Sequence, residues 1–220
     1  EAGRKGSLGS YYSVRDYCAV DPCLGTMEDF DAFVAEAHRL GMKVLLDWIA
    51  NHTARDARWV TEKPASWYER DASGAPTVPW DWTDTAKLNY AEREVWRAQG
   101  DAMEFWVREH GVDGFRCDMA MLVPIEFWNE TAQRLRRVKP GLFMLAEAEE
   151  TYLFDGGAFD ACYAWEMHHL MNDVAQQRVR VTSLRDYIYA DRRRYPRSAM
   201  RLAFTSNHDE NSWNGSEFAR

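Results

Sequence analysis

Hydrophobic residues recur every three or four positions in three segments, a spacing that predicts amphipathic α-helices at residues 26–40, 90–110 and 124–138. Each segment is followed by a short apolar run of strand length, at residues 42–46, 112–117 and 142–146. Weaker patterns predict strands at residues 16–20, 159–163 and 201–205, and helices at residues 165–177 and 184–194. Helix and strand therefore alternate over most of the chain.

This alternation predicts a parallel sheet whose strands are joined by helical crossovers. Asp118 and Glu147, at the ends of successive strands, lie 29 residues apart, about one strand–helix unit. Asp47 lies 71 residues before Asp118, and the excess falls in residues 53–90, where Gly, Pro and Trp concentrate. We expect one α/β domain over residues 1–220, a TIM barrel with residues 53–90 as an inserted loop or subdomain after the strand at residues 42–46. An open doubly wound sheet is the alternative, although no glycine-rich phosphate-binding turn supports it.

Acidic residues follow the apolar runs at four strand ends, at Asp47, Asp118, Glu147 and Asp209. The carboxyl ends of parallel barrel strands meet on one face, so we expect these acids in one active site. Arg116 lies two positions before Asp118, which places both side chains on the same face of a strand. The guanidinium is expected to lower the pKa of Asp118, whereas the apolar neighbours of Glu147 are expected to raise its pKa.

Composition narrows the classes of partner. The net charge of −8 argues against nucleic acid, which needs a basic face. No run of about 18 apolar residues is present, so no membrane span is predicted. The 10 Trp, 10 Tyr and 10 Phe residues fill the core and also provide rings that can cover the faces of sugars. The four cysteines show neither zinc-ligand spacing nor a CxxC motif, and both a cytoplasmic and an extracytoplasmic location stay open, as does the oligomeric state.

Four segments resemble, in order and spacing, the four motifs of the α-amylase superfamily of retaining α-glucan hydrolases and transglycosidases. They are residues 47–52, 114–118, 145–148 and 204–209. The resemblance implies hydrolysis of α-1,4-glucosidic bonds in starch- or maltodextrin-type glucans. It also implies that the first and last barrel strands lie outside this chain, so we expect an incomplete (β/α)8 barrel that exposes sheet edges and is unstable or inactive alone.

The resemblance assigns roles to the acids by their positions. Asp118 would be the nucleophile, Glu147 the general acid and then the base, and Asp209 would bind the 2- and 3-hydroxyl groups of the sugar. Arg116 would orient Asp118, and Asp47 would support Arg116 from the neighbouring strand. Retaining hydrolysis needs two carboxyl groups about 5–5.5 Å apart, one ionised and one protonated, which agrees with the environments expected for this pair.

The resemblance also implies contacts to the substrate. The ring of Tyr12 would stack on the sugar at the cleavage site, where His52 and His208 would hydrogen-bond it. Asn51 matches a calcium ligand of some amylases, so a structural calcium ion is compatible with the sequence, although calcium needs six to eight oxygen ligands. No cofactor is expected for the chemistry itself.

Some positions depart from the motifs of endo-acting members. Residues 121–122 are Met-Leu where many of those enzymes have Lys-His, and Ser13 follows Tyr12 where exo-acting α-glucosidases often have aspartate. Residues 87–89, Lys-Leu-Asn, resemble neopullulanase and cyclomaltodextrinase-like members. Two alternatives stay open: an α-glucan transglycosidase, and a non-catalytic sugar-binding or subunit-interaction domain on the same fold.

Overall fold

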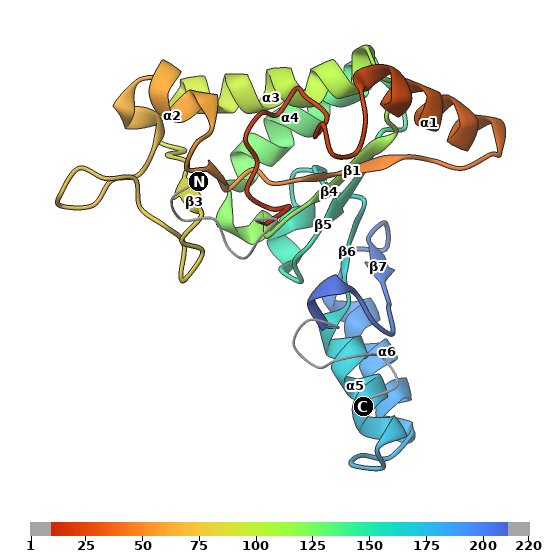
Figure 1. Ribbon diagram of the computed structural model, residues 1–220. Helices are drawn as coiled ribbons and strands as arrows, with labels where there is room; N and C mark the ends of the chain where they lie inside the picture. The colour runs from red at the N-terminus through yellow and green to blue at the C-terminus, as the bar shows by residue number, and fades with distance from the viewer. Residues whose placement is uncertain (1–9, 211–220) are drawn as a thin grey trace.

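The computed structural model describes residues 10–210 of the 220-residue chain. Five parallel strands form one sheet in the order β1-β4-β5-β6-β7 (Figure 1). The strands are β1 (Leu45–Trp48), β4 (Gly114–Cys117), β5 (Phe143–Ala146), β6 (Ala161–Tyr163) and β7 (Met200–Leu202). Because a TIM barrel has eight parallel strands, the sheet over these residues is an open part of a barrel.

Helices connect the strands as the sequence predicts. They are α1 (Met27–Arg39), α3 (Arg93–Arg108), α4 (Ile125–Val138), α5 (Trp165–Ala175) and α6 (Thr182–Arg194). In Figure 1, α3 and α4 lie along one side of the sheet, whereas α5 and α6 form a pair that extends away from it. None of the helices between residues 10 and 210 has the length and apolar character needed to cross a bilayer.

The strand predicted at residues 16–20 is wrong, since this segment consists of turns and bends. Side-chain contacts explain why. The backbone N–H of Cys18 donates to the carboxylate of Asp16, which favours a turn. The Tyr17 hydroxyl lies within hydrogen-bonding distance of two backbone carbonyls, those of Ile49 at 2.6 Å and His52 at 2.8 Å, and so holds the segment over the end of β1. Within residues 10–210, therefore, no strand precedes β1.

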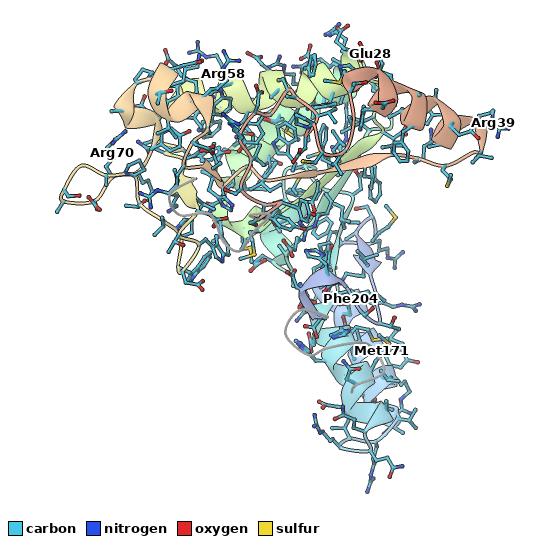
Figure 2. The ribbon with its side chains drawn as sticks, viewed as in Figure 1. Glu28, Arg39, Arg58, Arg70, Met171 and Phe204 are labelled. Atoms are coloured by element: carbon cyan, nitrogen blue, oxygen red, sulfur yellow. The ribbon has the colours of Figure 1, made fainter. Side chains whose placement is uncertain are left out.

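The inserted segment predicted at residues 53–90 has secondary structure of its own. It contains α2 (Arg58–Glu62), a 3₁₀ turn, η1 (Ala65–Trp67), and β3 (Thr85–Lys87), which pairs antiparallel with β2 (His52–Ala54). A small core of Trp67, Tyr68 and Leu88 packs beneath it. Arg58 and Arg70 mark this segment in Figure 2, at the opposite end of the molecule from Arg39 of α1.

Local signals in the sequence explain the ends of α1. The Thr26 hydroxyl accepts from the backbone N–H of Asp29, while the Asp29 carboxylate accepts from the backbone N–H of Thr26, a reciprocal cap of the first turn. The helix ends before Gly41, whose φ of 78° lies in the left-handed region that glycine adopts without strain.

The main core lies between the sheet and the helices α3 and α4. Phe115 of β4 and Met144 of β5 are fully buried in it, together with Met103 of α3 and Phe127 of α4. The two central strands approach closely at Gly114, where a Cβ atom would lie 1.9 Å from the carbonyl oxygen of Phe143. Only glycine fits there, so the contact between β4 and β5 depends on it.

The strand register aligns the carboxyl ends of β1, β4 and β5. Asp47 of β1 pairs with Arg116 of β4. Just beyond these strands, the backbone N–H of Asp118 donates to the carbonyl of Trp48, and that of Glu147 donates to the carbonyl of Cys117. These bonds extend the ladder by one residue and place both acids at the same edge of the sheet.

A buried carboxylate, that of Asp113, stabilises the amino-terminal ends of the same strands. Asp113, just before β4, accepts from the backbone N–H of Val44 at 2.9 Å, and contacts His38 at 2.7 Å and Lys139 at 2.9 Å. Burial alone would raise the pKa of Asp113, but these hydrogen bonds and one from Lys43 outweigh it and hold the pKa well below its usual range.

Asp113→Asn should lower the free energy of unfolding at pH 7 by about 1–3 kcal/mol, because it removes the charge that these donors share. A depressed carboxyl pKa stabilises the fold above the unfolded-state pKa of about 3.9, and the benefit is lost as the pH falls further. Urea unfolding at several pH values should therefore show a difference from wild type that shrinks below about pH 4. Asp186→Asn, at an exposed site, is the control, and an equal loss in both variants would contradict the account.

Candidate active site

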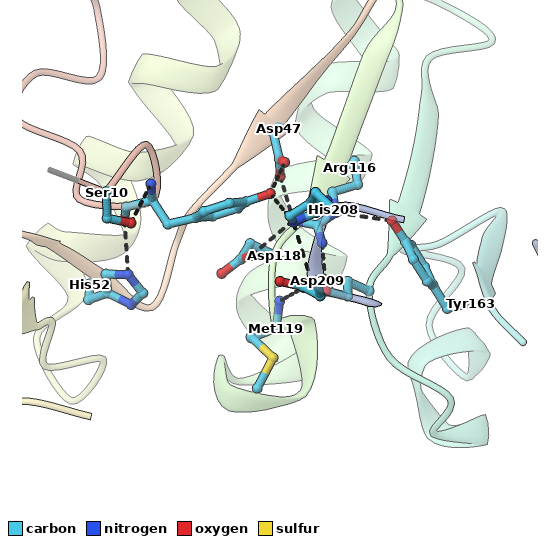
Figure 3. Close-up of polar contacts among 11 residues, drawn as sticks. Ser10, Asp47, His52, Arg116, Asp118, Met119, Tyr163, His208 and Asp209 are labelled. Carbon is cyan, nitrogen blue, oxygen red and sulfur yellow. Dashed lines mark hydrogen bonds and ion pairs between the residues drawn. The ribbon is translucent and has the colours of Figure 1, made fainter. Parts of the chain in front are cut away.

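One guanidinium group joins acids from three neighbouring strands. Arg116 Nη1 lies 2.7 Å from Oδ1 of Asp47 and 2.9 Å from Oδ1 of Asp118 (Figure 3). Its other terminal nitrogen, Nη2, lies 2.6 Å from Oε1 of Glu147. On the remaining side, Arg116 Nε donates to the hydroxyl of Tyr163, at the end of β6. Four strand ends therefore meet at a single positive charge.

Asp118 and Glu147 are both 6% exposed and belong to the same cavity wall. The second oxygen of Glu147 accepts from the backbone N–H of Met119 at 2.9 Å. Met119 has a φ of 41°, which is unusual for a residue with a long side chain and turns this N–H toward the acid. The two carboxyl groups share one guanidinium and are thus held close together.

The expectation that Arg116 keeps the pKa of Asp118 low is wrong. Burial and the neighbouring charge of Glu147 raise the pKa of Asp118 to about 7, although Arg116 opposes them. The main reason is burial of the carboxyl group, to which the charges of Glu147 and Asp47 add. Burial also raises the pKa of Glu147, in the expected direction, against the opposing effect of Arg116. The pair is therefore arranged to hold a proton near neutral pH.

Tyr12 and His208 cover one side of this pair. The Tyr12 hydroxyl donates to Oδ2 of Asp47 at 3.0 Å and lies 2.7 Å from Nε2 of His208. The two rings are stacked, with centroids 5.4 Å apart and planes inclined by 13°. His208 Nε2 lies 3.4 Å from Oδ2 of Asp209, and the charge of Asp209 acts on Glu147. The segment after β7 thus brings Asp209 to the same site.

His52 is buried and lines the cavity, but its two ring nitrogens contact protein groups. Nε2 lies 3.0 Å from the carbonyl oxygen of Tyr12, and Nδ1 lies 3.3 Å from the side-chain nitrogen of Asn51. Burial lowers the pKa of His52 to about 4, so the ring is neutral at pH 7. With Nε2 as the donor, His52 fixes the backbone of Tyr12 in place.

Asn51 alone does not make a calcium site. Its side chain is buried with its nitrogen directed at His52, and it offers at most one side-chain oxygen. Across residues 10–210, no group of three or more His, Cys, Asp or Glu side chains is placed to hold a metal ion. Calcium takes six to eight oxygen ligands, of which the Asn51 side chain would supply one, and the chemistry below does not use calcium.

A cavity of about 460 Å³ opens above the two acids. It brings together most of the predicted site residues, while Asp47 and Arg116 contact them from outside the wall. It also adds residues that sequence reasoning missed. Tyr163, which contacts Arg116 and is not among the lining residues, could have been found as the last residue of β6, whereas the loop residues that line the cavity carried no such signal. The lining residues are Ser10, Tyr12, His52, Trp82, Asp84, Thr85, Asp118, Met119, Glu147, His208 and Asp209.

Two solved structures share this fold. An α-amylase from Lactobacillus plantarum superposes with a TM-score of 0.88 at 34% identity, over 98% of this chain and 55% of that one. A maltogenic α-amylase, AmyB, from Thermotoga neapolitana superposes with a TM-score of 0.86 at 36% identity, over 95% of this chain and 48% of that one.

Curated relatives agree in family and differ in activity. Alpha-amylase MalA of Haloarcula japonica is 34% identical over 158 residues, which are 68% of this chain and 23% of that protein. An alpha-1,4-glucan:maltose-1-phosphate maltosyltransferase of Arcanobacterium haemolyticum is 35% identical, over 65% of this chain and 22% of that protein. A cyclomaltodextrinase of Geobacillus thermopakistaniensis is 27% identical, over 90% of this chain and 37% of that protein. The chain thus spans well under half the length of these relatives.

The family model for the alpha amylase catalytic domain matches residues 7–83 and 67–215, which include all the acids at the strand ends. With the fold, the ordered acids and this match in agreement, the chain belongs to the α-amylase family and forms part of its catalytic domain.

Proposed function

We propose that the protein hydrolyses α-1,4-glucosidic bonds in starch- or maltodextrin-type glucans by a retaining double displacement. The observation that carries this proposal is the pair Asp118 and Glu147, both buried, both in one cavity wall and both ion-paired to Arg116. Such a pair can supply a nucleophile and a proton donor to opposite ends of the same bond. The relatives named above act on glucans of this class.

In the first step, Glu147 gives its proton to the glycosidic oxygen while an oxygen of Asp118 attacks the anomeric carbon. The bond to the leaving sugar breaks, and a covalent glycosyl-enzyme forms. Glu147, now ionised, then takes a proton from water, whose oxygen displaces Asp118 from the anomeric carbon. The proton held by the pair must lie on Glu147 for this sequence to begin, and Arg116 stabilises the charge that remains on Asp118.

The other wall residues would hold the sugar in place. Tyr12 and His208 form a flat stacked surface beside the acids, which suits the face of a glucosyl ring. Asp209 would accept hydrogen bonds from ring hydroxyl groups and would favour the positive charge of the transition state. His52 would act on the sugar indirectly, because its hydrogen bond holds the backbone of Tyr12 in position.

Transglycosylation is the second candidate, supported by the maltosyltransferase among the relatives. It uses the same covalent intermediate and differs only in whether water or a sugar hydroxyl takes the glycosyl group. Product analysis with and without an added maltose acceptor separates the two. A non-catalytic domain is disfavoured by the acids at three strand ends, which all reach the site.

Asp118→Asn should lower kcat on starch by at least about 10³-fold, because the amide cannot form the glycosyl-enzyme. Turnover is measured by the release of reducing ends, and folding is checked by circular dichroism. Asp186→Asn, a surface change of the same chemistry, should keep wild-type turnover. Turnover by Asp118→Asn close to the wild-type rate would refute the proposed mechanism.

Glu147→Gln should separate the two steps. Loss of the proton donor should lower kcat on starch by about 10²–10⁴-fold. An α-glucosyl fluoride needs no proton on its leaving group, so its first step should stay within about tenfold of wild type, and burst kinetics measure that step. An equal loss on both substrates would mean that Glu147 is not the acid.

The pH dependence of kcat/KM should show the loss of the proton that Asp118 and Glu147 share. Since the pKa of Asp118 is raised to about 7, the pair loses its last proton near this pH, and kcat/KM on starch should fall as the pH rises above it. Glu147→Gln removes the neighbouring charge that helps raise this pKa. Its activity on α-glucosyl fluoride should therefore show no alkaline fall. The same fall in the variant would assign the titration to another group.

A further inference from the structure

The segment that carries Asp209 reaches the active site as an extension of β7. The strand ends at Leu202, and residues 203–207 lead without helix or strand to a helical turn at residues 208–210. The side chain of Asn207 caps this turn, since its Oδ1 atom accepts from the backbone N–H of Glu210 at 2.8 Å. A single helical turn is not stable alone, so the position of Asp209 depends on the contacts that anchor the segment.

A buried histidine of α5 contacts both ends of this segment. His168 is only 1% exposed. Its Nδ1 atom lies 3.2 Å from the carbonyl oxygen of Phe204, and its Nε2 atom lies 3.2 Å from Oε2 of Glu210. Because a carbonyl oxygen can only accept, Nδ1 is the donor in the first contact. One imidazole ring therefore bridges residues 204 and 210, and Asp209 lies within the bridged segment.

Ring packing fixes Phe204 relative to the catalytic cluster. The imidazole of His168 is stacked on the Phe204 ring, with centroids 4.7 Å apart and planes inclined by 13°. Phe204 also packs edge-on against Trp165 at 4.8 Å and against Tyr163 at 5.5 Å. The Tyr163 hydroxyl in turn accepts from Arg116. The start of the segment is thus held between α5 and the end of β6.

The imidazole of His168 is itself held in place. The backbone N–H of Ala164, just before α5, donates to the carbonyl of Leu202, so the helix begins attached to the strand from which the segment leaves. One turn along the same helix face, the side-chain nitrogen of Asn172 lies 3.2 Å from Nε2 of His168. His168 is not among the described residues that line the cavity, so its effect on a bound sugar must pass through the segment.

We propose that His168 is a positioning residue for the reaction, which places the carboxylate of Asp209 at the cleavage site by bridging Phe204 and Glu210. A carboxylate that is fixed in advance stabilises the positive charge of the transition state without having to reorganise. A displacement of about 1 Å, caused by a change far from the chemistry, can lower the rate by about 10²-fold. The inference rests on the proposed function for the role of Asp209, and it adds the side chain that gives Asp209 its position.

A double-mutant cycle between His168 and Asp209 tests this inference. Rates are measured on the full chain with an aryl maltoside, whose leaving group is followed by absorbance. His168→Ala should lower kcat by about 10- to 100-fold and change KM by less than about threefold. In an Asp209→Asn background, the same change should lower kcat by less than about threefold, because no carboxylate remains to be positioned. His169→Ala, at the exposed neighbouring histidine of α5, is the matched control and should keep the wild-type kcat.

An equal loss of kcat for His168→Ala in both backgrounds would overturn the proposal. A His168→Ala variant with the same kcat as His169→Ala would also overturn it. Folding of each variant is checked by circular dichroism. If His168→Ala does not fold, Glu210→Gln replaces it in the cycle, because this change weakens the contact at the other end of the segment. An equal loss for Glu210→Gln in both backgrounds would again overturn the proposal.

Binding of a charged sugar mimic separates this inference from the proposed function. The probe is 1-deoxynojirimycin, an iminosugar whose protonated ring carries the positive charge that develops in the transition state. By calorimetry, His168→Ala should weaken its binding by about tenfold, whereas His169→Ala should not. This difference in affinity, together with a wild-type protein that releases no product from starch, would reject the proposed function and keep the positioning role. Starch hydrolysis by the wild type, with equal iminosugar affinities in the two variants, would do the reverse.

Discussion

The buried positive charge of Arg116 is the interaction on which the site depends. It contacts one acid from each of the segments that end β1, β4 and β5, and so it holds three negative groups at one edge of the sheet. Without it, three carboxylates in such a confined space would repel one another and could not all be ionised. Even with it, burial and the remaining negative charge raise the pKa values of Asp118 and Glu147, so the pair retains a proton.

The backbone keeps this cluster in register. Hydrogen bonds from Asp118 to Trp48 and from Glu147 to Cys117 continue the parallel ladder just past the strands, so the acids inherit the rigidity of the sheet. The helices α3 and α4 both pack against one side of the sheet and bury the apolar side chains of β4 and β5 there. Side chains fixed in this way lose little further freedom when a substrate binds, which favours a site whose geometry is preorganised.

Much of this arrangement could be predicted from the sequence, because it depends on local patterns. Helical spacing and the cap at Thr26 predicted the alternation of helices with parallel strands, and the acids after short apolar runs predicted that Asp118, Glu147 and Asp209 lie at one edge. The strand expected at residues 16–20 failed because the contacts of Tyr17 with distant carbonyls override local propensity.

The other features that the sequence did not predict also depend on contacts between residues far apart in the chain. The pKa of Asp118 could not be predicted from its neighbour Arg116 alone, because it depends on how deeply the folded chain buries the carboxyl group and on the nearby charge of Glu147. Trp82 and Asp84 reach the cavity on a loop whose path is set by contacts with Ser13 and Arg55, far away in the sequence. No periodicity marks such residues, so they emerge only when the chain is folded.

Covalent trapping tests the central claim most directly. The protein is incubated with a fluorinated α-glucosyl donor whose second step is slow, and the labelled peptide is identified by mass spectrometry. The account predicts one added glycosyl group, attached to the carboxyl group of Asp118, and products that retain the α-configuration. Turnover with inverted configuration and no covalent adduct, or a label on another residue, would contradict it.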